Sequence, residues 1–404
     1  MSSVECLFVN ARLAGGASAA IAVSSGRIAG LHAAEALPPA GRVVDLGGQL
    51  VLPGFVEGHI HLDTSFYGEA WKPHRPDTAG FSVRERVSFQ MQNLAGAAPM
   101  FERACKQLEL CLAQGSTSMR SHVMVDAQVG LSHVETILAV REAYAERISL
   151  QLVAFPQSGI ISSPGTAALL DEAIALGCEE VGGLDPATID RDIEAHLDVV
   201  FGIADRRGVG VDIHLHDNGT LGVFEIEQIC ARTAAIGLGG RVAVSHAYAL
   251  GQVDANTLSR IADRLASAGV AIMTIAPPNS AFPPVAVLRD AGVTVFSGSD
   301  NIRDSWWPYG DGDMLRRANV IGHRSGFFED RQLEQAFDAV SYSGAKALGL
   351  DDYGIDVGDW ADFVVVPAQH VPEAVVAVPS QRAVYRRGKL VASNGLLVEG
   401  GGHA

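Results

Sequence analysis

Apolar residues along the 404-residue chain fall into short runs, and the pattern of these runs differs between the two ends and the middle. In residues 1–53 the apolar runs are brief and are separated by glycine and other turn residues, and residues 355–404 show the same pattern. Runs of this length between turn residues favour β-strands over helices. We therefore predict that both ends together form one small β-sandwich domain; two unrelated β-appendages are the alternative.

Residues 54–354 alternate between strand-like apolar runs and segments in which apolar residues recur at helical spacing. The strand-like runs are GSTSMRSHVMVD, ISLQLVAFPQSG, EEVGGLDPA, GVGVDIHLHD, GRVAVSHAY, GVAIMTIAPP and GVTVFSGSD. Steps of about 30 to 45 residues are typical of parallel strands joined by helical crossovers. About 300 residues holding seven or eight such units predict a distorted (β/α)8 barrel, the TIM-barrel fold of the α/β class.

An open, doubly wound sheet is the competing α/β architecture for this middle region. Such a sheet would carry a glycine-rich phosphate-binding turn after its first strand. The first strand here ends instead in GHIHLD. The barrel is therefore the preferred prediction.

The composition narrows the class of partner. Hydrophobic residues make up 48% of the chain and charged residues 19%, which suits a large buried core and argues against disorder. The 30 Lys and Arg residues against 46 Asp and Glu residues leave a net charge of −16. Nucleic acids and anionic membrane surfaces both require a basic footprint that this balance does not provide. We expect a small, neutral molecule as the partner and a homo-oligomer as the assembly.

The cysteines and the first residues bear on the compartment. Five cysteines occur without CxxC spacing, which predicts neither a disulfide framework nor a zinc knuckle and favours a reducing environment. The chain starts without the basic and apolar segments of a signal peptide. No apolar run approaches the roughly 18 residues of a membrane-spanning helix. These observations favour the cytoplasm.

Four histidines and one aspartate mark the ends of the predicted strands. His59 and His61 stand two positions apart, so their side chains point the same way on an extended strand. His214 lies near the end of GVGVDIHLH, His246 ends GRVAVSH and Asp300 ends GVTVFSGSD. The carboxyl ends of the strands carry the functional groups of such a barrel, and imidazoles with a carboxylate suit a divalent metal. A metal site is therefore predicted; packed core histidines are the alternative.

Several stretches, taken in order, resemble the amidohydrolase superfamily. They are LPGFVEGHIHLDTSF, RSHVMVD, LQLVAFPQSG, GCEEVGGLDPATID, VDIHLHDNGTLGVF, GRVAVSHA, SGSDNIRDSWWPYGDGDM and DYGIDVGDWADFVVV. They are most similar to the mononuclear-metal branch that includes cytosine deaminase and N-isopropylammelide isopropyl amidohydrolase. This resemblance implies a distorted barrel with a flanking β-sandwich. It also implies hydrolytic removal of an amino or alkylamino group from a small free nitrogen heterocycle, a cytosine-like pyrimidine or an aminotriazine.

The resemblance also implies a ligand set and catalytic roles. It assigns one divalent ion, Zn²⁺ or Fe²⁺, to His59, His61, His214 and Asp300. His246 then corresponds to the histidine that acts on the attacking water; a fifth ligand or a buried structural histidine is the alternative. Asp300 would shuttle a proton from that water to the leaving amine. No lysine ends a barrel strand where binuclear relatives carry a bridging one, which favours a single metal.

A second carboxylate departs from the pattern of cytosine deaminase. That enzyme has His-Cys-Asp-Glu, in which the Glu delivers the ring proton, where this chain has His214-Leu215-His216-Asp217. Asp217 thus takes the catalytic position with a side chain one methylene shorter. The isopropylammelide enzyme has a similar His-Ile-His-Asp stretch but a lysine where this chain, like cytosine deaminase, has Thr64. The site combines features of both relatives, so the substrate stays open.

Three further residues are candidates for binding the substrate. Gln157 matches the family glutamine whose amide both donates to and accepts from the base; a turn cap at the strand end is the alternative. Trp306 aligns with a pocket tryptophan that can stack on a flat ring, and the choice between it and Trp307 stays open. His216 faces the same side as His214 by strand alternation, which favours a contact with the substrate; a supporting role behind the metal ligands is the alternative.

Two other classes of function remain as alternatives. One is a related hydrolysis: opening of a cyclic amide at a ring C–N bond, or deamination of a purine or pterin. The other is a non-catalytic metal- or ligand-binding protein with the same fold. The complete ligand set together with His246 and Asp300 favours an enzyme, a hydrolase acting on the C–N bonds of cyclic amidines.

Overall fold

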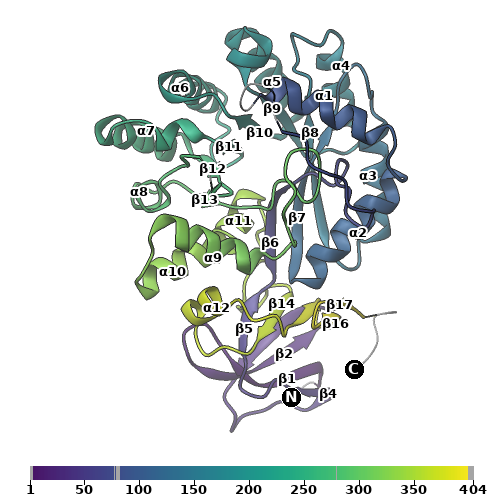
Figure 1. Ribbon diagram of the computed structural model, residues 1–404. Coiled ribbons are helices and arrows are strands. Elements are labelled where there is room, and N and C mark those ends of the chain that lie inside the picture. Colours follow the sequence, from purple (N-terminus) through teal and green to yellow (C-terminus); the bar gives the residue numbers. More distant parts are fainter. Residues whose placement is uncertain (1–2, 77, 79–81, 279, 399–404) are drawn as a thin grey trace.

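Two β-sheets organise the chain, one built from its two ends and the other from its middle (Figure 1). This computed structural model describes residues 3–76, 78, 82–278 and 280–398. In the described residues, the strands of the second sheet are all parallel and follow one another in sequence order, with helices connecting them. The α/β class and the barrel predicted for the middle of the chain are confirmed.

The elements of the barrel have the following bounds. Its strands are β6 (Phe55–Ile60), β7 (Ser116–Met124), β8 (Ser149–Phe155), β9 (Glu180–Leu184), β10 (Gly210–Leu215), β11 (Val242–His246), β12 (Val270–Met273) and β13 (Val295–Phe296). Its helices are α1 (Val83–Leu94), α2 (Met100–Ala113), α3 (Ser132–Ala143), α4 (Thr166–Leu176), α5 (Ile193–Arg207), α6 (Gly219–Ala235), α7 (Ala255–Ala268), α8 (Val285–Asp290), α9 (Met314–Ser325), α10 (Asp330–Asp338) and α11 (Tyr342–Ala347).

Helix α7 shows how the sequence produces these crossovers. Asp254 caps its first turn, because the carboxylate accepts hydrogen bonds from the backbone N–H groups of Asn256 and Thr257, both at 3.0 Å. The helix stops at Gly269, whose φ of 68° lies in the left-handed region. Its buried face carries apolar residues at helical spacing: Leu258, Ile261, Ala262 and Leu265. This face packs onto the barrel and leaves the polar residues of α7 in solvent.

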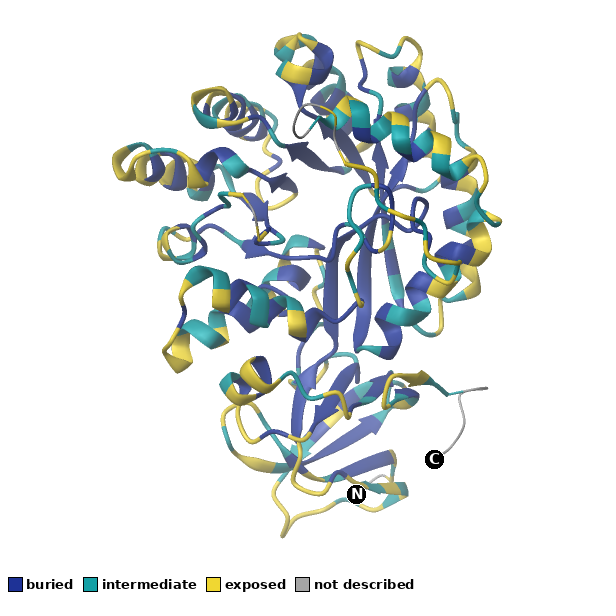
Figure 2. Cartoon of the chain, in the orientation of Figure 1, coloured by how far each residue is buried: buried dark blue, intermediate teal, exposed yellow. Residues whose placement is uncertain are grey.

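Alternation along the barrel strands separates the helix-facing core from the barrel interior. In β10, Val211, Ile213 and Leu215 join the apolar core beneath the helices, so Asp212 and His214 point to the interior. Figure 2 shows the barrel strands buried, whereas the surrounding helices expose their outer faces. The interior of the barrel therefore receives the polar residues of the strands.

The barrel closes where the segment after β13 meets β6. The backbone N–H of Asp300 donates to the carbonyl of His59 at 2.7 Å, and that of His61 donates to the carbonyl of Asp300 at 3.2 Å. Gly298 permits this approach, because a Cβ there would lie 2.4 Å from the backbone nitrogen of His59. Closure thus brings Asp300 beside the two histidines of the first strand.

The ends of the chain form the other sheet. Its strands are β1 (Val4–Arg12), β2 (Ser18–Ser24), β3 (Arg27–His32), β4 (Ala40–Asp45), β5 (Leu50–Pro53), β14 (Phe363–Val366), β15 (Ala383–Arg386), β16 (Lys389–Ser393) and β17 (Leu396–Leu397), with α12 (Val371–Ala377) packed nearby. Strand β14 runs antiparallel to β5, so the two ends pair directly. The rings of Phe8, Phe363 and Tyr385 pack together with centroids 4.8 to 5.0 Å apart. The boundaries 53/54 and 354/355 between the two parts stay predictions.

Within the part of the chain that the structure describes, no helix has both the length and the apolar character needed to cross a membrane.

Candidate metal centre and active site

The predicted metal-binding residues all lie at the carboxyl ends of barrel strands. His59 belongs to β6 and His61 directly follows it, His214 lies in β10, and His246 is the last residue of β11. Asp300 follows β13 and forms an isolated parallel β-bridge with Ile60. All five are buried, with between 0% and 9% of their surface exposed. The fold therefore brings five residues separated by up to about 240 positions to one place.

Strained backbone supports this arrangement. His246 (φ 73°) and Asp300 (φ 60°) adopt the left-handed conformation that non-glycine residues rarely take. In β11, Val242 and Val244 pack into the core beneath the helices, so regular alternation would turn His246 outward as well. The left-handed conformation lets its ring face the other histidines instead, 5.3 Å from that of His59 and 5.1 Å from that of His214 between centroids.

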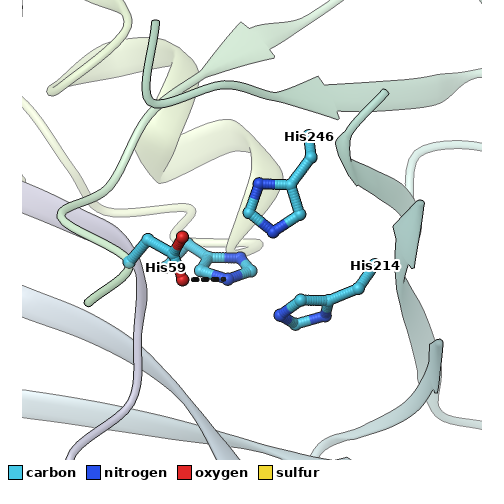
Figure 3. A group of neighbouring side chains, drawn as sticks. His59, His214 and His246 are labelled. Carbon is cyan, nitrogen blue, oxygen red and sulfur yellow. Dashed lines mark ion pairs between the residues drawn. The ribbon is translucent and has the colours of Figure 1, made fainter. Parts of the chain in front are cut away.

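The ligand atoms converge on one point (Figure 3). Each of His59, His214, His246 and Asp300 offers an atom within 4.8 Å of the others. Asp300 Oδ1 lies 3.5 Å from His59 Nε2 and 3.4 Å from His61 Nε2, and His61 Nε2 lies 3.3 Å from His214 Nε2. His59, His214, His246 and Asp300 thus share one centre. His61 lies outside this group of four but contacts two of its members, Asp300 and His214.

The pKa shifts of three of the histidines and of Asp300 suit a metal, whereas burial of His61 is outweighed by its contact with Asp300, which raises the pKa of His61. Burial lowers the pKa of His59, and it lowers the pKa values of His214 and His246 well below their ordinary value. Burial opposes ionisation of Asp300, but its close contacts with the imidazoles of His59 and His61 outweigh burial and hold the pKa of Asp300 well below its ordinary range. Neutral imidazoles and an ionised carboxylate are the forms in which these groups bind a metal. The buried Nε2 of His59 also has no hydrogen-bond partner among the described residues.

A hydroxyl group behind His59 determines which ring nitrogen faces the centre. Ser245 Oγ donates to Asp212 Oδ1 at 2.6 Å and lies 3.0 Å from His59 Nδ1. A hydroxyl can donate only one hydrogen bond, and Ser245 donates it to the carboxylate of Asp212. Ser245 Oγ therefore accepts a hydrogen bond from Nδ1–H of His59. The proton of His59 therefore sits on Nδ1, and the lone pair of Nε2 faces Asp300.

A second, smaller group shares His59. His59, His122 and Asp212 also offer atoms within 4.8 Å of one another, and the His122 ring lies against that of His59 with centroids 3.9 Å apart and the planes tilted by 33°. However, Asp212 already accepts hydrogen bonds from Ser245 and from Arg120 Nη1, the latter at 3.1 Å. We interpret this group as support for His59 rather than as a second ligand set.

A cavity of about 1320 Å³ opens above the centre. Its lining includes His61, His214, His246 and Asp300 together with all three predicted substrate-binding residues: Gln157, His216 and Trp306. Trp306 is held in place, because its Nε1–H donates to Gln90 Oε1 at 2.6 Å and its backbone N–H donates to Asp304 at 2.8 Å. Trp307 lines the same cavity, so the choice between the two tryptophans stays open.

His216 and Asp217 point in different directions. His216 lines the cavity and stacks on His246, with centroids 4.5 Å apart, while its Nδ1 donates to Asp185 at 2.9 Å. Asp217 is buried and accepts a hydrogen bond from the hydroxyl of Thr188. Among the described residues, those lining the cavity do not include Asp217. The catalytic role assigned to Asp217 by resemblance therefore stays a prediction.

Asp217 also has a buried acidic neighbour. Glu225 is fully buried, and burial followed by the charge of Asp217 raises the pKa of Glu225 to about 9. Burial likewise raises the pKa of Asp217, against the opposing hydrogen bond from Thr188. Glu225 therefore keeps its proton near neutral pH and can donate it to a hydrogen bond with Asp217.

Four supporting residues were not found from the sequence: Asp185, Asp212, Ser245 and Gln90. Asp212 had a signal, because it stands two positions before His214 and shares its face of the strand. Asp185 had a weaker one, since it follows the strand-like run EEVGGL. Ser245 and Gln90 had none, because their roles depend on which side chains lie opposite them in the folded chain.

Comparison with known proteins places this site in a family. The amidohydrolase family pattern matches residues 42–392. The N-isopropylammelide isopropyl amidohydrolase of Pseudomonas sp. strain ADP is 31% identical over 362 residues, which cover 88% of this chain and 89% of that protein.

Two solved structures are similar over nearly the whole chain. The structure of N-isopropylammelide isopropylaminohydrolase from Burkholderia multivorans superposes with a TM-score of 0.93 and 39% identity, covering 98% of this chain and 100% of that one. That of 5-methylcytosine deaminase from Klebsiella pneumoniae, liganded with phosphonocytosine, superposes with a TM-score of 0.84 and 29% identity, covering 96% and 98%. With most of its length matched by the family pattern, the chain belongs to the amidohydrolase family.

Proposed function

We propose that the protein is a metal-dependent aminohydrolase that removes an amino or alkylamino group from a small free nitrogen heterocycle, a cytosine-like pyrimidine or an aminotriazine. The observation that carries this proposal is the convergence of His59, His214, His246 and Asp300 on one point beneath the cavity, with His61 in contact with Asp300 and His214. The relatives named for isopropylammelide and 5-methylcytosine support the substrate class. Location in the cytoplasm and assembly as a homo-oligomer stay predictions.

The proposed cofactor is one divalent ion, Zn²⁺ or Fe²⁺, held by His59, His61, His214 and Asp300. Nitrogen ligands with one carboxylate suit either ion. When bound, such an ion lowers the pKa of a coordinated water to about 7 and makes it a nucleophile near neutral pH. The orientation of His59 by Ser245 is the kind of support that such ligands receive from their neighbours.

The side chains around the centre account for the remaining steps. His246 holds and polarises the attacking water, and Asp300 takes its proton and passes it to the leaving nitrogen. A C–O bond forms at the ring carbon and the exocyclic C–N bond breaks, so that one water yields one amine. Asp217 is proposed to supply the proton that the ring nitrogen gains, and the second proton of the water, released as the product C=O forms, restores the proton of Asp217. Gln157, His216 and Trp306 are proposed to hold the ring.

A substrate screen with the metal-loaded protein tests this function. Amino-substituted pyrimidines, triazines, purines and pterins are incubated with the protein, and released ammonia or alkylamine is measured alongside the metal content. We expect amine release from at least one pyrimidine or triazine, and loss of that release in His246→Ala. Absence of release from every compound would contradict the proposal.

The mass of the product separates the proposal from its closest alternative. Replacement of an amino group by a hydroxyl leaves the ring intact, whereas cyclic amide hydrolysis adds a whole water to the substrate. A ring-opened product without free amine would show that the alternative reaction is the correct one. Activity confined to purines or pterins would support the proposed reaction, release of an amine by hydrolysis, and contradict the proposed substrate class.

A further inference from the structure

A partly buried cation lines the cavity. Arg317, in the second turn of α9, lines the cavity together with Ile275 from the loop after β12. Its Nη1 donates to the carbonyl of Ile275 at 3.0 Å. This hydrogen bond fixes the guanidinium against the rim of the barrel mouth that follows β12.

No carboxylate neutralises this guanidinium within the part of the chain that the structure describes. Arg317 has no ion pair there, and its buried Nε has no hydrogen-bond acceptor. Burial lowers the pKa of Arg317, and only the more distant charges of Glu57, Asp300 and Asp311 oppose this effect. Asp311 is already paired with Arg316 at 2.7 Å, and Asp300 belongs to the proposed ligand set.

Removing an unpaired cation from water is costly, so cations that folding withdraws from solvent usually have a partner. Two buried arginines of this chain show such pairing. Arg120 pairs with Glu180 and Asp212, and Arg382 pairs with Asp313 at 2.8 Å. Arg317 differs from these two arginines, because it has no carboxylate partner among the described residues and lines a cavity that a ligand can enter.

The barrel topology places Arg317 opposite Gln157. The strand order β13-β12-β11-β10-β9-β8-β7-β6 puts four steps between β8 and β12, so in the nearly closed barrel the two strands lie on opposite sides. Gln157 follows β8, and Arg317 is anchored to the residue two positions after β12. A flat ring over the metal centre therefore has Gln157 at one edge and Arg317 at the other.

The cavity is also larger than a bare pyrimidine requires. Its volume of about 1320 Å³ exceeds the roughly 300 to 1,000 Å³ typical of ligand pockets. A substituted ring can thus extend from the metal centre toward Arg317. The planar fork of a guanidinium matches an oxyanion through two parallel hydrogen bonds.

We propose that Arg317 binds an oxyanion at the edge of the substrate ring that lies opposite Gln157, so that the substrate is an acidic amino-heterocycle. This inference rests on the proposed function, because it names the substrate class of the same site. The oxyanion is a carboxylate substituent or a ring oxygen that ionises. The local positive charge of Arg317 favours an acidic substrate, although the net charge of −16 by itself favours a neutral one.

Binding of non-reacting rings tests the inference without requiring turnover. The affinities of the metal-loaded protein for orotate, barbiturate and uracil are measured by calorimetry. Orotate carries a ring carboxylate, barbiturate an ionised ring oxygen, and uracil neither. We expect wild type to prefer one of the two anions over uracil by about 10- to 100-fold, the contribution of charge-assisted hydrogen bonds. The preferred anion identifies the source of the charge.

Arg317→Met should abolish this preference and leave the affinity for uracil unchanged, whereas Arg317→Lys should retain part of it. Arg264→Met, which removes a positive charge on the outer helix α7, is the matched control and should behave as wild type. If Arg317→Met does not fold, the inference is tested by the ratio of anion affinity to uracil affinity in the other two proteins. This ratio should be high in wild type and lower in Arg317→Lys. Equal affinities for the three rings in wild type, or equal weakening of all three in Arg317→Met, would overturn the inference.

The outcome separates the inference from the proposed function. Amine release from neutral heterocycles without preference for acidic ones would sink the role of Arg317 and leave the proposed function intact. An Arg317-dependent preference for the anions, with no amine released from any heterocycle, would support the binding site and contradict the proposed function.

Discussion

Ser245 Oγ lies 3.0 Å from Nδ1 of His59 and donates its own proton to Asp212 at 2.6 Å. These two contacts leave His59 with its proton on Nδ1 and its Nε2 lone pair toward Asp300, 3.5 Å away. The direction of these two hydrogen bonds matters, because the opposite tautomer of His59 would present an N–H to the centre. That tautomer could not bind a metal through Nε2. A residue that touches neither metal nor substrate thus prepares the proposed ligand.

Replacing this hydroxyl should weaken metal binding. Ser245→Ala leaves Nδ1 of His59 without its acceptor, and we expect about 10- to 100-fold lower metal affinity. Competition with a chelator of known affinity measures the effect. Ser297→Ala is the matched control, since Ser297 is also buried but donates to the carbonyl of Thr274. Equal metal affinity in Ser245→Ala and wild type would show that the contact does not orient His59.

Asp300 is assigned two roles, as ligand and as proton shuttle. Asp300→Ala should therefore abolish turnover and lower the metal content of the purified protein. Elemental analysis and an amine-release assay check the two effects separately. Asp171→Ala, on the outside of the barrel and paired with Arg207, is the control and should change neither. A fully active Asp300→Ala variant would refute both assignments.

Substitutions of Asp217 and His216 should affect different kinetic constants. If Asp217 supplies the ring proton, Asp217→Asn should reduce kcat by about 10²- to 10⁴-fold with little change in KM. His216→Asn should mainly raise KM, because His216 lines the cavity. Steady-state kinetics of both variants on the best substrate of the screen tests this split. A raised KM with unchanged kcat in Asp217→Asn would refute the proton-donor role.

Glu225 should make the protein less stable as the pH rises. Its pKa is raised from 4.5 to about 9 in the folded protein, mainly by burial and then by the charge of Asp217. Between these two values the folded chain holds a proton that the unfolded chain has released, so unfolding becomes easier with increasing pH. Each pH unit within this window removes at most about 1.4 kcal/mol from the contribution of this group to stability.

Urea unfolding of wild type and Glu225→Gln across this window measures the effect. The difference in unfolding free energy, wild type minus variant, should fall steadily from about pH 5 to about pH 9 and then level off. Glu227→Gln is the control, since Glu227 lies on the same helix in an ion pair at the surface. A difference that stays constant with pH would contradict the retained proton.

The sequence was sufficient for elements whose signal is local. The alternation of Val211, Ile213 and Leu215 with polar residues predicts a strand, and the spacing of Leu258, Ile261 and Leu265 predicts a helix. Strands and crossovers in regular succession then predict the barrel. His59 and His214 were found in the same way, because their place at a strand end follows from period two.

Other features depend on contacts between distant segments. His246 would point away from the centre by alternation, and only its left-handed backbone turns it inward. The closure of β13 onto β6 requires Gly298, whose importance is visible only from the 2.4 Å approach of its position to His59. The different directions of His216 and Asp217 depend on Asp185 and Thr188, which belong to other parts of the chain.

By itself, the sequence determined the fold class, the family resemblance and the residue types at the metal centre, because these depend on periodicity and on order along the chain. Only the tertiary structure decided which nitrogen of His59 faces the centre and where Asp217 points. It also showed that Arg317 has no counter-ion among the residues that the structure describes. The physical reason is that tautomer, side-chain direction and charge compensation depend on the groups that folding brings within a few ångströms. Those neighbours lie tens to hundreds of positions away along the chain.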